Sequence, residues 1–497
     1  MPPSPANGPP PTAEQQAVID HQDGNLVVLA AVGSGKTTTL GRRIARALEQ
    51  GIRPERVLAL TFTNRAAMHM RESLERVVAP EIAQKVNLST FHALCSRILR
   101  SANEAAGLPS DFRILDEDDA QELLADFDPD GGPRSALFAL AEAASQTPLH
   151  GCKVDNWHKG VLLDAPWLPK YAQALADRGA VDFAGLVYLT RAVLTEDAGD
   201  DGQESEALSQ WRTSFDMVQV DEVQDTHLSE YEVLRVLASR ARSLCLVGDL
   251  DQTIYSWRGS APHALLKRVE QDFGSMTHLS LTRCFRATRR VLAVADALAT
   301  GLSNRTSTVE AAATMPAGTL PTLHGFPNNT TERVHIARTA QALIADGVPA
   351  EDIAVLVRTN KEIGLLAGTF EAQRVPCTTI EQFRFFRRQD VKDALGLARL
   401  VVDRRDEFAA RRIAMRLVQG VGARTVQRIV REGRPLGLRL CDLMDTTTVT
   451  HGDPLWALGT TDCVVLDTET TGLSAEDDEV IEIGAVRLRG GHCSGAP

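Results

Sequence analysis

Residues 30–37 have the types and spacing of a loop that binds phosphate. The stretch reads A-x-x-G-x-G-K-T, with Ala30 in the place where the first glycine of this pattern usually stands. Its glycines allow backbone N–H groups to turn toward one point, and a following helix directs its positive dipole end there. Lys36 can then reach the terminal phosphates of a nucleoside triphosphate, and the Thr37 hydroxyl can bind Mg²⁺. The predicted nucleotide-binding residues of this loop are Gly33, Ser34, Gly35, Lys36, Thr37 and Thr38.

A pair of acidic residues, Asp221 and Glu222, comes directly after an alternating apolar stretch at 215–220. In an enzyme with a phosphate-binding loop, the first carboxylate holds Mg²⁺, usually through water, because this ion keeps much of its hydration shell. The second carboxylate can take a proton from the attacking water. An Asp-Glu pair alone means little, but together with the glycine loop it predicts a site that hydrolyses a nucleoside triphosphate.

A third stretch, 243–259, again has an apolar run followed by polar side chains. Gln252 can sense the γ-phosphate or position water. Trp257 beside Arg258 offers a stacking face and a phosphate donor, a pairing used for single-stranded nucleic acid, although a tryptophan packed in the core is the alternative. Arg286 follows the next apolar run, where it is a candidate arginine finger.

These residues need a scaffold that brings them to one edge. The apolar runs at 26–31 and 57–60 are each followed by a helix-forming stretch, the order expected of buried parallel strands. Ligands of open α/β sheets bind past the carboxyl ends of the strands, where Phe62 and His92 are expected. A buried core aromatic is the alternative for Phe62. The Gln15 amide suits the edge of adenine, but a polar residue on a short amphipathic helix is also common.

Length and composition are typical of a globular protein with about three or four domains, since the chain has 497 residues, 43% of them hydrophobic and 24% charged. A net charge of −12 argues weakly against coating of a polyanion by the whole surface. No apolar run approaches the ~18 residues of a membrane helix, and the N-terminus resembles a disordered Pro-rich tail rather than a signal peptide. The eight cysteines form no C-x-x-C pair, so neither zinc nor an iron–sulfur cluster is indicated, and we expect a cytoplasmic protein.

Two regions differ from the rest of the chain. Residues 111–205 predict an all-helical insertion, acidic near its start and followed by a solvated linker at 197–206. Residues 404–434 contain nine arginines and three acidic residues. Composition alone leaves two interpretations of this basic run open, a solvated helix face and a contact with DNA backbone.

Six ordered motifs resemble those of the UvrD/Rep/PcrA-like superfamily 1 DNA helicases. In chain order they are AAVGSGKT, LTFTNRAA, STFH, DEVQDT, VGDLDQTIYSWRG and LTRCFR. The similarity continues through IAVLVRTN, FRFFRRQDVKD and GVGART, and it spans roughly residues 12–435. It implies an α/β fold, a P-loop NTPase with RecA-like parallel sheets and helical insertions. It also implies a 3′–5′ DNA helicase that uses ATP and Mg²⁺ and translocates on single-stranded DNA tails, with tailed duplex DNA as partner and no membrane.

The resemblance also assigns roles residue by residue. Gln15 would contact adenine, and Phe285 would stack on it where the family usually has tyrosine. Asp221 and Thr37 would bind the metal, and GVGART would touch duplex backbone, which favours DNA contact for the basic run. The implied catalytic residues are Glu222 as base, Gln252 as the link between γ-phosphate and DNA, and Arg286 as the finger. The implied DNA-binding residues are Phe62, His92, Trp257, Arg258, Arg358 and Asn360. The departures at Val223, His227 and Cys284 are mild.

One departure from the family is large. Its later motifs, a T-x-H-x-x-K-G-like and an R-L-x-Y-V-A-x-T-R-like stretch, are absent from the sequence, and the second of these supplies a second arginine finger. We therefore expect the chain to bind ATP without working alone as a motor. A truncated ATP- and DNA-binding module without turnover, and the N-terminal part of a helicase–exonuclease fusion, are the alternatives.

The C-terminal stretch D-x-E-x-T-G at 467–472, with a hairpin-like return strand, resembles the first motif of DnaQ-like exonucleases of the DEDD type. Asp467 and Glu469, alternate residues on one strand face, would bind two metal ions for phosphodiester cleavage. An ordinary strand and turn is the alternative. Because the later metal ligands are absent from the sequence, we expect no nuclease activity from the 497-residue chain.

These motifs divide the chain into predicted domains. The predicted boundaries are 1–11 for the tail, 12–110 and 206–285 for the first RecA-like motor domain, 111–205 for the helical insertion, 286–395 for an incomplete second motor domain, 396–445 for the start of a helical duplex-binding insertion, 446–460 for a linker, and 461–497 for a truncated exonuclease-like segment.

Overall fold

The computed structural model divides the chain into two compact units, Met1–Thr322 and Leu323–Pro497. It describes residues 9–125, 165–195, 206–254, 261–302, 308–379, 388–404, 406–433, 440–443, 463–470, 480–489 and 492–493, with residue 305 and a few residues between 127 and 163. The division after Thr322 falls inside the predicted second motor domain, 286–395, and the finer domain boundaries stay predictions.

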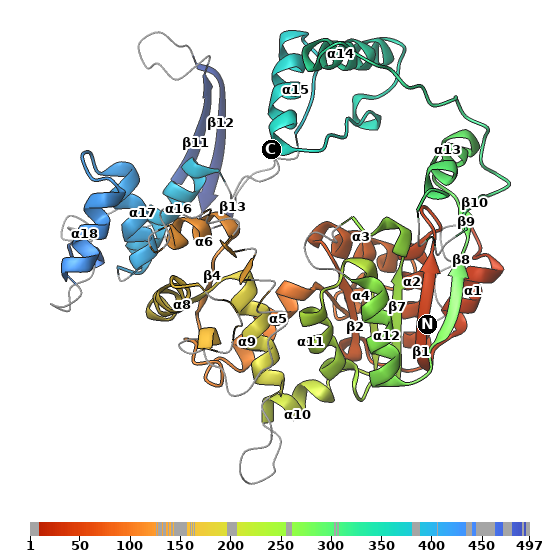
Figure 1. Ribbon diagram of the computed structural model, residues 1–497, viewed down its shortest axis with the longest axis horizontal. Coiled ribbons are helices and arrows are strands. Elements are labelled where there is room, and N and C mark those ends of the chain that lie inside the picture. The colour runs from red at the N-terminus through yellow and green to blue at the C-terminus, as the bar shows by residue number, and fades with distance from the viewer. Residues whose placement is uncertain are drawn as a thin grey trace. The chain divides into compact units, whose positions relative to one another are not determined.

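A parallel sheet of six strands forms the centre of the first unit (Figure 1). Its order is β3 (Asn87–Thr90), β2 (Val57–Thr61), β6 (Met217–Val220), β7 (Ser243–Gly248), β1 (Gly24–Ala30) and β8 (Thr277–Leu281). Every pairing in this sheet is parallel. The α/β class and the strands predicted at 26–31 and 57–60 are therefore confirmed.

Helices cover both faces of this sheet because its strands are apolar on both sides. Alternate residues of β1 pack in one cluster with α2 (Lys36–Glu49) and α3 (Asn64–Glu75). Figure 1 shows α11 (Leu228–Ala238) and α12 (Pro262–Phe273) over the other face. Two helices begin directly after strands, where threonine side chains accept hydrogen bonds from backbone N–H groups: Thr63 caps α3 and Thr90 caps α5 (Phe91–Ser101). The remaining short elements near the sheet are α1 (Ala13–Asp20), α4 (Pro80–Ala83), η1 (Pro54–Arg56), η3 (Val223–Asp225) and η4 (Leu250–Gln252).

The insertion predicted at 111–205 is mainly helical, but it is not all-helical as expected. Its described helices are α6 (Glu117–Leu124), η2 (Trp157–Lys159), α8 (Leu168–Asp177) and α9 (Phe183–Thr195), followed by α10 (Glu206–Arg212). Two short strands, β4 (Arg113–Ile114) and β5 (Ala180–Val181), pair in parallel. The buried Asp182 accepts hydrogen bonds from the Tyr171 hydroxyl at 2.8 Å and the Gly185 backbone N–H at 2.6 Å, which fixes the start of α9.

The last part of the first unit leaves the sheet. After β8 come β9 (Arg283–Cys284), α13 (Arg289–Ala299) and β10 (Glu310–Ala311), and β9 pairs in parallel with β10. Ala31 donates its backbone N–H to the Leu281 carbonyl at 2.9 Å, so the chain after β1 and the end of β8 lie together.

In the second unit, α14 (Asn329–Ala345) and α15 (Asn360–Ala372) pack through a small apolar cluster, and η6 (Ala350–Asp352) lies between them. The apolar segment 354–357 that follows is not a strand, and Leu356 is 94% exposed. A run that is apolar on both faces needs neighbouring strands and covering helices to be buried. Within the described part of this unit the only sheet is the antiparallel one near the C-terminus.

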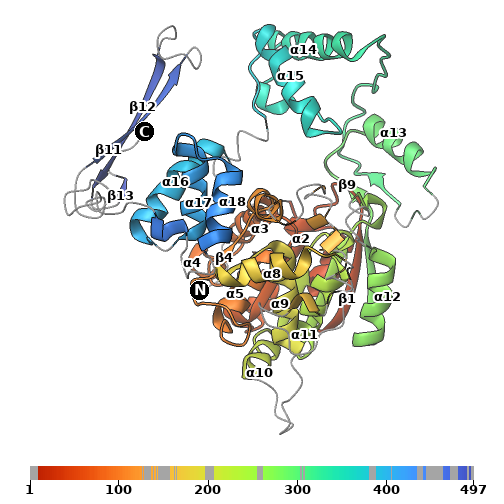
Figure 2. The same cartoon turned by 60° about the vertical axis from the view of Figure 1, so that its left-hand side comes forward.

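Three further helices of this unit form a second cluster: α16 (Gln389–Val402), α17 (Glu407–Leu417) and α18 (Ala423–Gly433), joined by η9 (Leu440–Leu443) (Figure 2). The predicted GVGART turn lies between α17 and α18, where Gly420 has a φ of +80°. Two helices with a turn between them therefore lie inside the basic run at 404–434.

The C-terminal hairpin is built of β11 (Cys463–Thr470) and β12 (Val480–Arg489), extended by β13 (His492–Cys493). Asp467 pairs with Gly484 and Glu469 with Glu482, and the register shifts after Glu469. The predicted strand and its return strand are therefore confirmed. Among the described residues of the chain, none of the helices has the length and apolarity required to cross a membrane.

Candidate active site

The phosphate-binding loop joins β1 to α2 through two glycines in the left-handed region. Gly33 has a φ of +67°, and Gly35, at the N-terminal cap of α2, has a φ of +80°. A side chain on Gly33 would lie 2.7 Å from Cβ of Arg286, and one on Gly35 would lie 2.9 Å from Nε2 of Gln15. Both positions therefore need glycine for conformation, and Gly33 also needs it for space.

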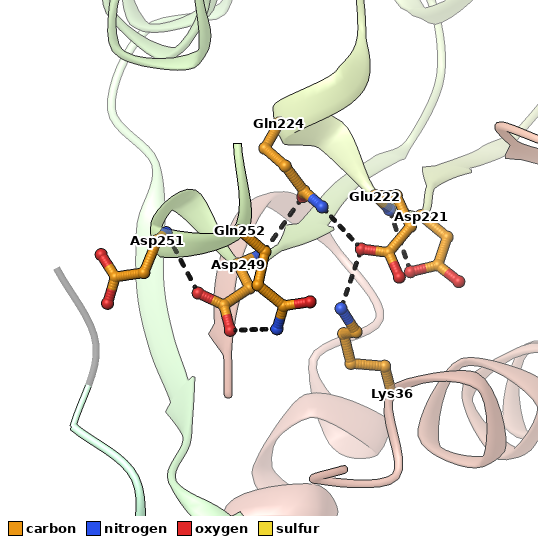
Figure 3. A network of polar contacts seen from close by, with 7 residues as sticks. All are labelled: Lys36, Asp221, Glu222, Gln224, Asp249, Asp251 and Gln252. Atoms are coloured by element: carbon orange, nitrogen blue, oxygen red, sulfur yellow. Dashed lines mark hydrogen bonds and ion pairs between the residues drawn. The ribbon is translucent and has the colours of Figure 1, made fainter. Parts of the chain in front are cut away.

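Lys36, the first residue of α2, points at the carboxylate pair (Figure 3). Its Nζ lies 2.8 Å from Oε2 of Glu222, and the same oxygen accepts a hydrogen bond of 2.8 Å from Nε2 of Gln224. Oε1 of Gln224 in turn accepts the backbone N–H of Asp249 at 3.1 Å. One hydrogen-bonded chain thus joins the residues that follow β1, β6 and β7.

The carboxylate of Asp249 orients the predicted γ-phosphate sensor. Its Oδ2 accepts a hydrogen bond of 2.7 Å from Nε2 of Gln252, and its Oδ1 accepts the backbone N–H of Asp251 at 3.1 Å (Figure 3). Burial raises the pKa of the Asp249 carboxyl, while the Gln252 amide lowers it. Gln252 is therefore held on the same edge of the sheet as Lys36.

Glu222 has an unusual backbone conformation. Its φ of +55° lies in the left-handed region, which a residue other than glycine adopts at a cost of about 1–3 kcal/mol. Its backbone N–H donates to Oδ1 of Asp221 at 3.0 Å. Among the described residues other than glycine, only Arg374 shares this conformation, so the strain falls on the residue predicted to be the base.

Asp221 is the buried member of the pair, with 6% of its surface exposed. Burial and the neighbouring Glu222 charge raise the pKa of its carboxyl to about 7, against the opposing influence of Lys36 and of the Glu222 backbone N–H. A positive ion beside this carboxyl would lower the cost of ionising it. The carboxylate of Asp221 and the hydroxyl of Thr37 are the oxygen ligands that Mg²⁺ prefers, so the donor set fits this ion.

No group of three or more His, Cys, Asp and Glu side chains that could hold a metal occurs in the part of the chain that the structure describes. An ion bound by one protein carboxylate and by substrate phosphates is the usual arrangement for Mg²⁺. The side chains of Asp467 and Glu469 lie outside the described residues, so the proposed exonuclease metals stay a prediction.

Two further predicted residues meet the glycine loop. Nε2 of Gln15 donates to the Ser34 carbonyl at 2.9 Å, and Oε1 of Gln15 accepts the Thr12 backbone N–H at 3.0 Å. The Phe285 backbone N–H donates to the Gly33 carbonyl at 2.8 Å, and the Phe285 side chain is 42% exposed. The structure therefore brings Gln15, Phe285 and Arg286 to the loop, and their roles in nucleotide binding stay predictions.

The predicted DNA-binding residues are spread over both units. Phe62 is half-buried directly after β2, and His92, in the first turn of α5, contacts the ring of Phe183 edge-on at 5.1 Å. Arg358 is exposed and Asn360 begins α15 in the second unit. Trp257 and Arg258 lie outside the described residues.

The arginines of the basic run fall into two groups. Nε of Arg412 lies 2.6 Å from Asp393, and Nε of Arg416 lies 3.3 Å from the same carboxylate, so both help to hold α17 against α16. Arg424 and Arg428, one turn apart on α18, are exposed. Among the described arginines of the run, this second pair contributes to the exposed basic surface of α18.

Gln224 was not predicted, although it lies in the DEVQDT motif. Its side chain bridges Glu222 and Asp249. The end of β7 can approach Val223 and Gln224 this closely only because residue 248 is glycine: a side chain there would meet Cγ1 of Val223 at 2.9 Å and collide with the Gln224 amide. Its polar side chain, two positions after the predicted base, is the feature of the sequence that points to a role in the site.

Comparison with known proteins gives the family. The UvrD/REP helicase N-terminal domain matches residues 11–274, the UvrD-like helicase C-terminal domain matches residues 279–461, and an exonuclease domain matches residues 464–495. The chain belongs to the UvrD/REP helicase family. It is 30% identical over 430 residues to the ATP-dependent DNA helicase PcrA of Staphylococcus aureus, and 29% identical over 436 residues to that of Staphylococcus epidermidis. Each match covers 84% of this chain and 57% of the relative, so the chain spans little more than half the length of these helicases.

Lys36→Ala should weaken binding of ATP with Mg²⁺ by ~2 kcal/mol or more, because a charge-assisted phosphate contact is lost. Lys85→Ala, which removes an exposed lysine in the same unit, is the matched control. Calorimetric titration of the three proteins measures the difference, and equal affinities of wild type and Lys36→Ala would contradict the assignment of the loop.

Asp221→Asn should stabilise the nucleotide-free protein at pH 8 by about 1–3 kcal/mol. The pKa of Asp221 is raised in the fold from 3.8 to about 7, so the folded state binds the proton more tightly than the unfolded chain, and stability falls as pH rises between these values. Asp216→Asn is the opposite control. Its side-chain hydrogen bonds with Arg56 lower its pKa, so its ionised form stabilises the fold above pH 4.

Chemical denaturation at pH 5 and pH 8 measures both variants. The gain for Asp221→Asn should shrink at pH 5, while Asp216→Asn should remain destabilising at pH 8. A destabilised Asp221→Asn protein at pH 8 would show that the buried carboxylate does not oppose folding.

Proposed function

We propose that this chain carries the ATP- and DNA-binding machinery of a 3′–5′ DNA helicase that acts on single-stranded DNA tails. The observation that supports this most is the hydrogen-bonded chain from Lys36 through Glu222 and Gln224 to Asp249. It joins a phosphate-binding lysine to a general base and to the turn that holds the γ-phosphate sensor. The 3′–5′ polarity and the preference for tails rest on the family resemblance.

The ion pair between Lys36 and Glu222 suggests how nucleotide binding prepares the base. A lysine ammonium is a single charge, so the phosphates of ATP compete with Glu222 for it. When Lys36 turns to the phosphates, the Glu222 carboxylate loses its cation but keeps its hydrogen bond from Gln224. It can then accept a proton from a water molecule aligned with the terminal phosphate.

Three other residues complete the proposed chemistry. Thr37 and Asp221 would hold Mg²⁺, which when bound neutralises charge on the phosphate oxygens. Gln252, oriented by Asp249, would sense the γ-phosphate. Arg286, whose Cβ is close to Gly33 of the loop, would stabilise the charge that develops on this phosphate.

For DNA we propose two kinds of contact. Phe62, His92, Trp257 and Arg258 in the first unit, with Arg358 and Asn360 in the second, would grip a single strand by stacking and by phosphate contact. The α17–α18 pair would contact duplex backbone through its exposed arginines. We also propose a cytoplasmic location, which the five free cysteines of the described residues support.

A second candidate function is an ATP- and DNA-binding module without turnover. The observation that favours it is the apolar segment 354–357, which forms no strand and leaves Leu356 94% exposed. A motor of this family closes two domains on ATP and reopens them, which needs a stable second domain. The exonuclease match at residues 464–495 supports a further alternative, in which this chain is the N-terminal part of a helicase–exonuclease fusion.

Replacing both Arg424 and Arg428 with Ala should make duplex binding less dependent on salt. Each phosphate contact contributes about 0.9 to the slope of log K against log salt concentration, so the slope should fall by about 2. Arg338→Ala, which removes an exposed arginine of α14, is the control. Fluorescence anisotropy with a labelled duplex at several salt concentrations measures the slopes, and identical slopes would make this helix face an ordinary solvated one.

The isolated chain should bind ATP but show neither DNA-stimulated hydrolysis nor strand separation. Absence of a second arginine finger costs about 10³–10⁵ in rate in related phosphoryl transfer. The measurements are ATP turnover with and without single-stranded DNA, and unwinding of a 3′-tailed duplex. Lys36→Ala and Glu222→Gln are the inactive controls. Robust unwinding by the wild-type chain, abolished in both variants, would favour the complete motor over the binding module.

A further inference from the structure

Glu14 in α1 makes two hydrogen bonds to a single residue far away in the sequence. Its Oε2 accepts the backbone N–H of Thr282 at 2.9 Å, and its Oε1 accepts the Thr282 hydroxyl at 2.7 Å. Thr282 lies between the end of β8 and the start of β9. Both oxygens of the carboxylate are therefore used to hold the point where the chain leaves the sheet.

Gln15, the neighbour of Glu14 in α1, contacts the glycine loop. Nε2 of Gln15 donates to the Ser34 carbonyl of the glycine loop at 2.9 Å. The Phe285 backbone N–H donates to the Gly33 carbonyl of that loop at 2.8 Å. Helix α1, the glycine loop and the turn at 282–286 are thus joined in a closed ring of hydrogen bonds.

The space between the loop and this turn is tight. A Cβ atom on Gly33 would lie 2.7 Å from Cβ of Arg286 and 2.9 Å from Sγ of Cys284. A small displacement of the turn would therefore move Arg286 relative to the phosphates that the loop holds. Thr282 is four residues before Arg286, close enough for its anchor to set the position of that turn.

We propose that Glu14 is a positioning residue that sets Phe285 and Arg286 against the bound nucleotide, and that α1 thereby couples base recognition at Gln15 to the finger. This inference rests on the proposed function, in which Arg286 faces the γ-phosphate. The alternative is that the Glu14 bonds only anchor α1 to the sheet. The two differ in one measurable respect, because a finger that meets the γ-phosphate distinguishes ATP from ADP, whereas an anchor does not.

The chain offers well-matched variants. Glu14→Gln keeps the size of the side chain but loses its charge and one of its two acceptors, and Thr282→Val removes the hydroxyl donor. Thr282→Ser keeps both donors and should behave as wild type. Asp23→Asn removes another carboxylate link near α1, in which Nη2 of Arg242 lies 2.8 Å from Asp23, but this link leads to the start of β7 and not to the finger.

The experiment is titration of the full chain with fluorescent mant-ATP and mant-ADP in the presence of Mg²⁺, and the quantity compared is the ratio of the two Kd values. Loss of a hydrogen bond to a charged group predicts that Glu14→Gln lowers the preference for ATP about tenfold, and Thr282→Val less. Thr282→Ser and Asp23→Asn should keep the wild-type preference. Arg286→Ala should abolish it, and adding Glu14→Gln to Arg286→Ala should then cost far less than in the wild type.

The outcomes separate the inference from the proposed function on which it rests. If Arg286→Ala removes the preference for ATP while Glu14→Gln and Thr282→Val lower only the melting temperature, Glu14 is an anchor and the inference is wrong. If the wild type binds neither nucleotide, or if Arg286→Ala leaves the preference unchanged, the proposed role of the finger fails and the inference falls with it. Thr282→Val keeps the test decisive if Glu14→Gln does not fold.

Discussion

The ion pair between Lys36 and Glu222 depends on one constraint, the order of strands in the parallel sheet. Lys36 follows β1 and Glu222 follows β6, but these strands are not neighbours, because β7 lies between them. Their side chains meet only by passing over the end of β7, where Gly248 has no side chain to obstruct Gln224. The sheet thus fixes which residues share the site, and Gly248 leaves room for Val223 and Gln224 beside them.

The site carries an excess of negative charge before any nucleotide binds. Asp221, Glu222 and Asp249 lie around one lysine, and the pKa values of Asp221 and Asp249 are both raised, chiefly by burial. At the opposite end of β6, Asp216 has its pKa lowered by hydrogen bonds from Arg56. Strand β6 is therefore preceded by Asp216, whose paired carboxylate stabilises the fold, and followed by Asp221, whose buried carboxylate does not. A buried carboxylate that opposes folding in this way is typical of a functional site.

The strands and the glycine loop could be predicted because their signal is local. The run at 57–60 is apolar at every position, and the strand extends only one residue further. Segment 354–357 has the same pattern but forms no strand, since a parallel strand exists only with its neighbours. The roles of Gln224 and Glu14 could not be predicted, for a different reason. Each acts by joining segments distant in sequence, and nothing in the residues around it indicates the partner.

The position of β8 explains why the turn that carries Arg286 depends on contacts from outside the sheet. Strands β6, β7 and β1 are each hydrogen-bonded on both sides, whereas β8 lies at the edge of the sheet and pairs only with β1. An edge strand has half the ladder of a central one, so the turn after it is less constrained. The bonds from Phe285 to Gly33 and from Thr282 to Glu14 supply what the missing neighbour does not. Because both contacts end at the glycine loop or at the helix beside it, this edge strand is held by the elements that would bind the ligand.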